Sequence, residues 1–170
     1  IMKKILLAFC FISAALLTVN GQNKKAEREA AAQAAFEKAL ATIETKNYVI
    51  IVATYQTADG MFADNTDNAN FLAFENDNVI LQGGIVAGNN NTNKLAVSDY
   101  NQATDKKGNV RISYQAMGRL INAKISMSLK KSAGNMAEVI ITPTKGTAKR
   151  FNGLIVPTAE SKHYRRPGEI

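Results

Sequence analysis

Residues 121–129 read INAKISMSL, so that every second side chain is apolar. Val110, Ile112 and Tyr114 show the same period of two a few residues upstream. Alternation of this kind is typical of a β-strand with one face on the core and the other in water. The pattern predicts an antiparallel sheet built around these two segments.

Further strands are predicted on the N-terminal side of this stretch. Residues 48–55, 70–74 and 79–82 are rich in β-branched, aromatic and other apolar side chains. The pair Asn76-Asp77 suits the tight turn of a hairpin between the last two segments. Residues 83–93 are rich in Gly and Asn and are predicted to form a loop.

The same alternation continues on the C-terminal side. Val139 and Ile141 are predicted to face the core, and so are Leu154 and Val156. The connecting segments are of hairpin size, as in Asp105 to Gly108. Short connectors join only antiparallel neighbours, because a parallel pair needs a crossover of about a dozen residues or more. We expect a meander of about seven or eight strands.

One helix is predicted before the first strand, over residues 22–46. This segment is rich in Ala, Glu, Lys and Gln and contains neither Gly nor Pro. Ala32, Phe36, Leu40 and Ile43 are spaced so that they form one apolar stripe. An amphipathic helix with such a stripe is expected to pack against a sheet.

Together these elements predict a single domain of α+β class. The N-terminal amphipathic helix would pack on one face, or in the mouth, of a curved antiparallel meander sheet or partly closed barrel. The predicted boundaries are 22–46 for the helix, 47–158 for the antiparallel β domain and 159–170 for a flexible C-terminal tail. The tail is polar and shows no period.

The first 21 residues have the features of a signal peptide. Met2-Lys3-Lys4 is a positively charged start, and residues 5–19 form an apolar run without a charge. We place cleavage after Gly21, so that the mature chain begins at Gln22 and contains no cysteine. The run of 15 residues is shorter than the roughly 20 that a spanning helix needs. We therefore expect a periplasmic or secreted protein, not an integral membrane protein.

Charge is unevenly distributed along the chain. Residues 47–93 hold five acidic and no basic residues, whereas residues 94–170 hold 14 basic and five acidic residues. Such a field favours anionic surfaces such as lipid headgroups or acidic glycans, although solubility alone also accounts for it. No dense basic run with interleaved aromatic residues is present, so we expect no nucleic-acid partner.

Residues suited to catalysis or metal binding are few. The one histidine, His163, lies in the predicted tail, and a catalytic triad needs a positioned imidazole. Asp59, Asp64 and Asp67 do not have the spacing of a calcium-binding loop. We therefore predict no catalytic residue, no metal site and no cofactor, and we expect that the protein is not an enzyme.

Aromatic side chains on the predicted strands are the best candidates for a binding site. In a strongly curved sheet they would line an apolar cavity. Packing in the core is the alternative, because large apolar side chains are usually buried. The candidates are Tyr48, Tyr55, Phe71, Phe74, Tyr100 and Tyr114.

Turns and strand spacings carry a resemblance to a known family. The features are Lys107-Gly108-Asn109-Val110, the strand Ala137-Glu138-Val139, Pro143 with Gly146, and Gly153 with Pro157. In these features the chain resembles, over approximately residues 26–157, the exported Bacteroidetes proteins grouped as domain of unknown function 4251. The resemblance implies one exported domain of α+β or barrel-like type, and it implies no catalytic or binding residue.

These observations favour a non-enzymatic binding or envelope-associated domain of the periplasm. Its ligand would be an apolar or amphiphilic molecule such as a lipid, or a partner chain, held on the curved sheet. Two alternatives stay open. One is a carboxylate-dependent hydrolase that uses acidic residues between 59 and 77, Glu75 and Asp77 among them. The other is a structural protein that pairs through the two edges of an open meander.

Overall fold

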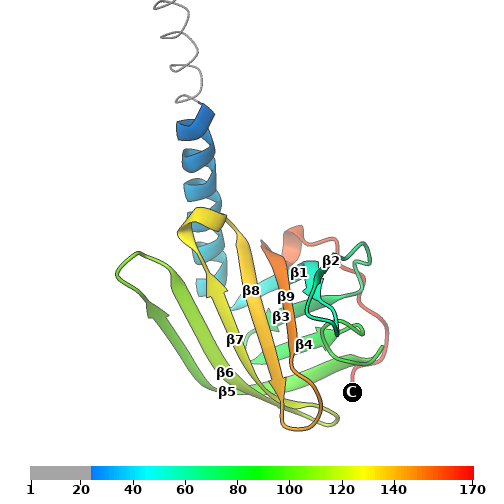
Figure 1. The fold of residues 1–170 in the computed structure, drawn as a ribbon. Coiled ribbons are helices and arrows are strands. Elements are labelled where there is room, and N and C mark those ends of the chain that lie inside the picture. Colours follow the sequence, from blue (N-terminus) through cyan, green and yellow to red (C-terminus); the bar gives the residue numbers. More distant parts are fainter. Residues whose placement is uncertain (1–23) are drawn as a thin grey trace, which may run out of the picture.

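The structure is a computed structural model that describes residues 24–170. The predicted leader, residues 1–21, and its cleavage site lie outside the described residues. A helix occupies residues 24–44, and nine strands and two short 3-10 helices follow it in the described part (Figure 1). The strands are β1 (Asn47–Gln56), β2 (Phe62–Asp64), β3 (Phe71–Glu75), β4 (Asn78–Gln82), β5 (Thr92–Thr104), β6 (Val110–Gly118), β7 (Asn122–Leu129), β8 (Met136–Pro143) and β9 (Lys149–Pro157), and the 3-10 helices are η1 (Lys131–Ala133) and η2 (Thr158–Glu160).

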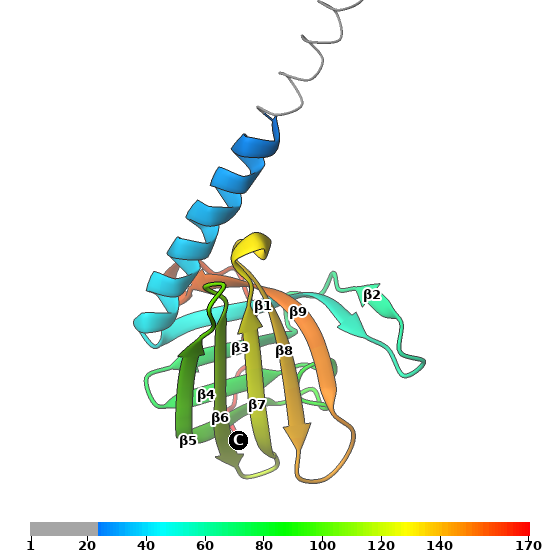
Figure 2. The same cartoon turned by 60° about the vertical axis from the view of Figure 1, so that its left-hand side comes forward.

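Within residues 24–170, eight of the strands close into an antiparallel barrel. Neighbours follow the order β1, β3, β4, β5, β6, β7, β8 and β9, and β9 pairs back with β1. The closing register runs from Tyr48 opposite Pro157 to Tyr55 opposite Phe151. The short strand β2 pairs with the end of β1 and stands out from the barrel wall (Figure 2). One helix and a mainly β chain fit the predicted α+β class, but the sheet is a closed barrel and not an open meander.

Closure between β1 and β9 removes most of the free edge on which the edge-pairing alternative depends. β1 has β9 on one side and β3 and β2 on the other. In the described part of the chain, the three residues of β2 have an unpaired side, and so does the part of β5 after Val97, which pairs only with β6. The edge of β2 is too short to be a good template for another chain, so the end of β5 is the longer edge that could pair with one.

Apolar side chains from the barrel strands fill the interior. Val110, Ile112 and Tyr114 of β6 are buried, and so are the alternate residues of β7 from Ala123 to Leu129. An eight-stranded barrel is just wide enough for side chains to fill it. The prediction from the period of two is confirmed for these strands.

The helix lies over one end of the barrel, which we call the helix end (Figure 2). The start of β1, the β5–β6 turn, the β7–β8 loop and the end of β9 form this end. Phe36, Ala39 and Ile43 of the helix are buried in the same apolar cluster as the barrel interior. Gly134 of the β7–β8 loop has a φ of 62°, and a Cβ there would lie 3.3 Å from the Cβ of Ala35. Loop and helix are therefore in contact, whereas the first two turns of the helix are exposed.

A second apolar cluster lies on the outside of the barrel. Val49, Phe71, Ala73 and Ile80, from β1, β3 and β4, are buried there. These strands are therefore buried on both faces, which explains why their sequences are nearly continuous apolar runs.

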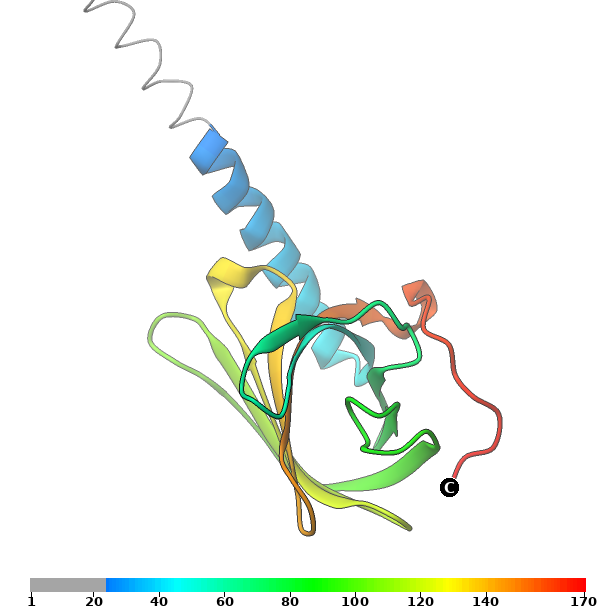
Figure 3. The same cartoon turned by 45° about the vertical axis from the view of Figure 1, so that its right-hand side comes forward.

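The C-terminal segment, residues 161–170, runs along the barrel wall (Figure 3). The backbone N–H of Tyr164 donates to the carbonyl oxygen of Asn68, and that of Ile170 donates to the carbonyl oxygen of Thr92. This arrangement differs from the flexible tail that we expected over 159–170. The segment is polar and shows no period, so its sequence did not indicate that it forms backbone hydrogen bonds with the rest of the domain.

The inner face of β9 is the opposite of the predicted one. Leu154, expected to face the core, is 39% exposed, and Val156 packs against the outer cluster. Phe151 and Ile155 are the buried inner residues. Apolar residues lie on both faces of this strand, so its period does not identify the inner face.

The bounds of strand β5 were not predicted from the sequence, although Tyr100 within it was placed on a strand. Its 13 residues are mostly polar, and its register shifts between Ser98 and Asn101, opposite β6. This bulge breaks the alternation that signals a strand. The predicted loop over 83–93 is confirmed as far as residue 91.

Candidate functional site

Four of the six predicted aromatic residues lie together inside the barrel. The ring centroid of Phe74 is 5.5 Å from that of Tyr48 and 5.4 Å from that of Tyr114. The Tyr100 ring stacks on Tyr114 with a centroid distance of 6.0 Å. At these separations the four rings contact one another and form packed core, not the wall of an open cavity.

A lysine covers this aromatic cluster at the helix end. The Nζ of Lys46 lies 2.8 Å from the centroid of the Tyr100 ring, which is a cation–π contact. Burial lowers the pKa of Lys46, and the charges of Glu44 and Asp77 oppose that shift. Lys46 and Asp99 have φ angles of 55° and 54°, which are unfavourable for residues with a Cβ. The contact therefore includes one strained backbone position, Lys46, and a second strained position, Asp99, directly precedes Tyr100.

The hydroxyl of Tyr48 is buried and has no hydrogen-bond partner in the described part of the chain. Burial raises the pKa of Tyr48 well above its usual value, and the neighbouring Tyr114 and Tyr100 act in the same direction. Burial also raises the pKa of Tyr100 to about 12, with a smaller contribution from Glu44. The cluster thus holds hydroxyls that stay protonated at neutral pH.

The other two aromatic candidates lie elsewhere. Tyr55 packs against the rim of the main cluster, where β1 pairs with β9. Phe71 is buried on the outer face, and its ring centroid is 4.4 Å from that of His163. The predicted set of six residues therefore does not form a single site.

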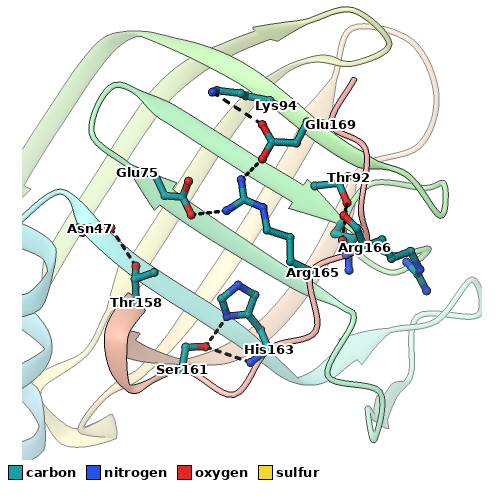
Figure 4. A network of polar contacts seen from close by, with 11 residues as sticks. Asn47, Glu75, Thr92, Lys94, Thr158, Ser161, His163, Arg165, Arg166 and Glu169 are labelled. Carbon is teal, nitrogen blue, oxygen red and sulfur yellow. Dashed lines mark hydrogen bonds and ion pairs between the residues drawn. The ribbon is translucent and has the colours of Figure 1, made fainter.

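His163, which we expected in a loose tail, is held by its surroundings (Figure 4). Its Nδ1 lies 2.8 Å from the Oγ of Ser161. Burial lowers the pKa of His163, as does the charge of Arg165, whereas Glu75 opposes the shift. Arg165 donates to Glu75 at 2.8 Å and also pairs with Glu169. These contacts fix the C-terminal segment on the sheet.

A buried glutamine at the end of β4 joins this segment to the start of β5 and to the turn before β3. The Nε2 of Gln82 donates to the carbonyl oxygens of Ala69 and Tyr164, at 3.0 and 2.7 Å. Its Oε1 accepts from the Thr92 hydroxyl at 2.6 Å and from the Arg166 N–H at 2.8 Å. Both ends of the amide are satisfied, so Gln82 is an anchor shared by β4, β5 and the C-terminal segment.

A cavity of about 480 Å³ lies at the end of the barrel opposite the helix, which we call the far end. The loop after β4, the β6–β7 turn and the β8–β9 turn enclose it. Val86 and Ile141, both buried, form its floor with the partly buried Ile121. Its volume lies in the range of pockets that hold small molecules. We call it the far-end pocket.

Three cations surround the far-end pocket. Arg119 comes from the β6–β7 turn, Lys145 from the β8–β9 turn and Lys149 from the start of β9. The Cε of Lys149 would lie 3.7 Å from a Cβ on Gly88, so this side chain reaches the loop across the mouth. None of the residues that line the pocket is acidic. The site therefore combines an apolar floor with a positive rim.

The model of a family described as Domain of unknown function (DUF4251) matches residues 30–155. The chain belongs to the DUF4251 family. The resemblance seen in the turns and strand spacings is thereby confirmed. A crystal structure of a DUF4251 family protein from Bacteroides eggerthii is similar, with a TM-score of 0.67 and 25% identity. The match covers 78% of this chain and 94% of that one. No curated protein matches the chain in sequence.

In this DUF4251 chain, Asp64 and Glu75 of the acidic region end strands β2 and β3, and the other carboxylates of that region lie in turns and loops. A hydrogen bond from the Thr57 hydroxyl, with a second from the Met61 N–H, lowers the pKa of Asp59. Asp67 accepts from the N–H of Ala69 at 2.9 Å. Among residues 24–170, no group of three His, Cys, Asp or Glu side chains is placed to hold a metal ion. The same residues include no helix with the length and apolar character needed to cross a membrane.

The residues of the far-end pocket were not predicted in this DUF4251 chain. Arg119, Lys145 and Lys149 lie in or beside turns that read as ordinary hairpin connectors. The excess of basic residues after position 94 was the only signal for them. Barrel closure brings the turns to one end, and a period of two along single strands does not contain that information.

Proposed function

We propose that this chain is an exported, non-enzymatic binding protein that holds an anionic amphiphile in the far-end pocket. The observation that carries the proposal is the rim of Arg119, Lys145 and Lys149 around an apolar floor, with no acidic lining residue. A carboxylate or similar headgroup would accept charge-assisted hydrogen bonds from the rim. The apolar part of the ligand would cover the floor.

The exposure of Leu120 supports an amphiphile over a purely polar anion as the ligand. Leu120, which also lines the pocket, is 56% exposed. An exposed apolar side chain gains from a ligand that removes it from water. A small inorganic anion would leave Leu120 in solvent.

Export is the second part of the proposal. The charged start and apolar run of residues 1–21 support cleavage before Gln22 and a periplasmic or secreted location. Fractionation of the native host, followed by N-terminal sequencing, tests it. Recovery from the periplasm or medium with Gln22 first supports export, and recovery from the cytoplasm with Met2 retained contradicts it.

Binding is tested with oleate as the probe, by isothermal titration calorimetry. The variant Lys145→Gln/Lys149→Gln removes two rim cations. We expect its affinity for oleate to fall at least tenfold, because the loss of a single charge-assisted hydrogen bond already weakens binding by about that factor. The control Lys124→Gln/Lys162→Gln removes the same charge from the outer face of β7 and from the C-terminal segment. We expect the control to bind oleate as the unchanged protein does.

The neutral amphiphile monoolein provides the second arm of this experiment. It has a similar apolar chain but no charge, so it should bind at least tenfold more weakly than oleate. Equal affinities for the two amphiphiles, or equal losses in the rim variant and the control, would remove the basis for an anionic ligand.

A further inference from the structure

A second group of cations lies at the helix end of the barrel, away from the far-end pocket. One face of the helix and the tips of two connections enclose a groove of about 630 Å³. The β5–β6 turn contributes Lys107, and the β7–β8 loop contributes Lys130 and Lys131. The helix contributes Lys25 and Arg28. We call these five residues the helix-end cations.

The three elements that carry these cations are joined to one another. The backbone N–H of Lys131 donates to the Oδ1 of Asn109 at 3.2 Å, which links the loop to the turn. The Cδ of Lys131 would lie 3.9 Å from a Cβ on Gly108, so its stem crosses over the turn. Gly134 of the same loop packs against Ala35 of the helix. The cations are thus presented from a fixed framework and not from independent loops.

Little negative charge compensates them. Glu29 is the one acidic residue among those lining the groove, and it pairs with Lys25 at 3.9 Å. Within residues 24–170, Arg28, Lys107 and Lys131 have no carboxylate oxygen within 4 Å. A concentration of positive charge at one end of a small domain steers that end toward anionic surfaces.

The surroundings of the helix-end cations favour a lipid surface over other polyanions. Lysine stems and Ala32 line the groove with aliphatic groups, which suit the boundary between headgroups and acyl chains. No aromatic side chain lines it, so it offers no stacking platform for nucleobases.

We infer that the helix end docks this protein on a lipid bilayer with anionic headgroups. The helix-end cations would lie among the headgroups, and the far-end pocket would face away from the bilayer. This surface is independent of the ligand proposed for the pocket, because the two sites lie at opposite ends of the barrel and share no residue.

Sedimentation with lipid vesicles tests this inference. Vesicles of equimolar phosphatidylglycerol and phosphatidylcholine are compared with vesicles of phosphatidylcholine alone. Each basic residue near an anionic bilayer contributes about fivefold to the affinity, so Lys107→Gln/Lys131→Gln should bind the anionic vesicles about 25-fold more weakly. The matched control is again Lys124→Gln/Lys162→Gln, which removes the same charge elsewhere and should change binding less than about threefold. Added salt should release the unchanged protein.

All proteins are purified from the native host, so that they share the same processed N-terminus. Equal weakening in the groove variant and the control would overturn the inference, and so would equal binding to neutral and anionic vesicles. Stronger binding to soluble polygalacturonate than to the anionic vesicles would assign the groove to an acidic polysaccharide instead. The groove variant should keep its affinity for oleate, which separates a failure here from a failure at the pocket.

Discussion

Gly153 of β9 lies so close to Ile51 of β1 that a Cβ on Gly153 would be 2.7 Å from the Ile51 carbonyl oxygen. The same Cβ would be 2.6 Å from the Cγ2 of Ile50. Gly153 pairs with Val52, directly before the register of the two strands shifts. This is where the barrel closes, and only a residue without a side chain allows the two strands to approach so closely.

Gly153→Ala should therefore weaken closure of the barrel. Overpacking usually costs about 1–3 kcal/mol, and we expect the upper part of that range because the clash involves backbone atoms. The measurement is urea unfolding followed by far-UV circular dichroism. Gly84→Ala is the control, since a Cβ there meets no atom within 4 Å. Equal stability of the two variants would show that the close approach at Gly153 is unimportant.

Tyr48→Phe should stabilise the protein. The substitution removes a buried hydroxyl that has no hydrogen-bond partner in the described part of the chain and keeps the ring that stacks on Phe74. An unpaired buried polar group costs about 1–3 kcal/mol, so we expect a gain of about 1 kcal/mol. Thermal unfolding measures it, with the exposed Tyr164→Phe as control. A loss of stability in Tyr48→Phe would mean that the hydroxyl has a partner, such as a buried water.

Gln82→Leu should release the C-terminal segment. The leucine keeps the volume of the side chain but removes the partner of the Tyr164 carbonyl, the Ala69 carbonyl and the Arg166 N–H. We expect a cost of about 2–4 kcal/mol and faster hydrogen exchange in residues 161–170. Hydrogen exchange with mass spectrometry detects it, and the exposed Gln115→Leu is the control. Unchanged exchange in that segment would exclude Gln82 as its anchor.

His163 should make the protein less stable in mild acid. Its pKa is lowered in the folded state, mainly by burial, so the unfolded state binds a proton first as the pH falls below about 6.5. The free energy of unfolding therefore decreases between about pH 6.5 and the lower pKa of the folded state, and this loss persists below it. Urea unfolding at about pH 7.5 and about pH 5 should show a larger decrease for the unchanged protein than for His163→Gln. Identical decreases in both proteins would contradict this role.

The sequence was most informative where one face of a strand meets water. In β6 and β7, Ile112 and Ile125 alternate with polar residues, and the period alone identified both strands and their inner faces. The Asn76-Asp77 turn was also predicted from the sequence. A two-residue hairpin turn needs a residue that tolerates a positive φ, and Asn76 has a φ of 56°. Local chemistry determines these features, so a single sequence suffices.

Features that depend on contacts between distant segments could not be predicted from the sequence. The C-terminal segment contacts the sheet through backbone groups and Gln82, and neither leaves a periodic signal. Phe71 and Phe74 are three residues apart in one strand, so alternation places them on opposite sides of the wall. The apolar character of both faces was a sign that something covers the outside, but it does not identify the cover. The far-end pocket requires closure between β1 and β9, which joins segments about a hundred residues apart.

A titration of isotope-labelled protein with oleate, followed by amide chemical shifts, tests the proposed ligand site most directly. We expect the largest shifts in the three segments that surround the far-end pocket, at Val86 to Asn89, Arg119 to Asn122 and Thr144 to Lys149. The helix and the helix-end cations should change little. Shifts centred on Tyr48, Tyr100 and Tyr114, or no saturable shift at all, would contradict an anionic amphiphile in this pocket.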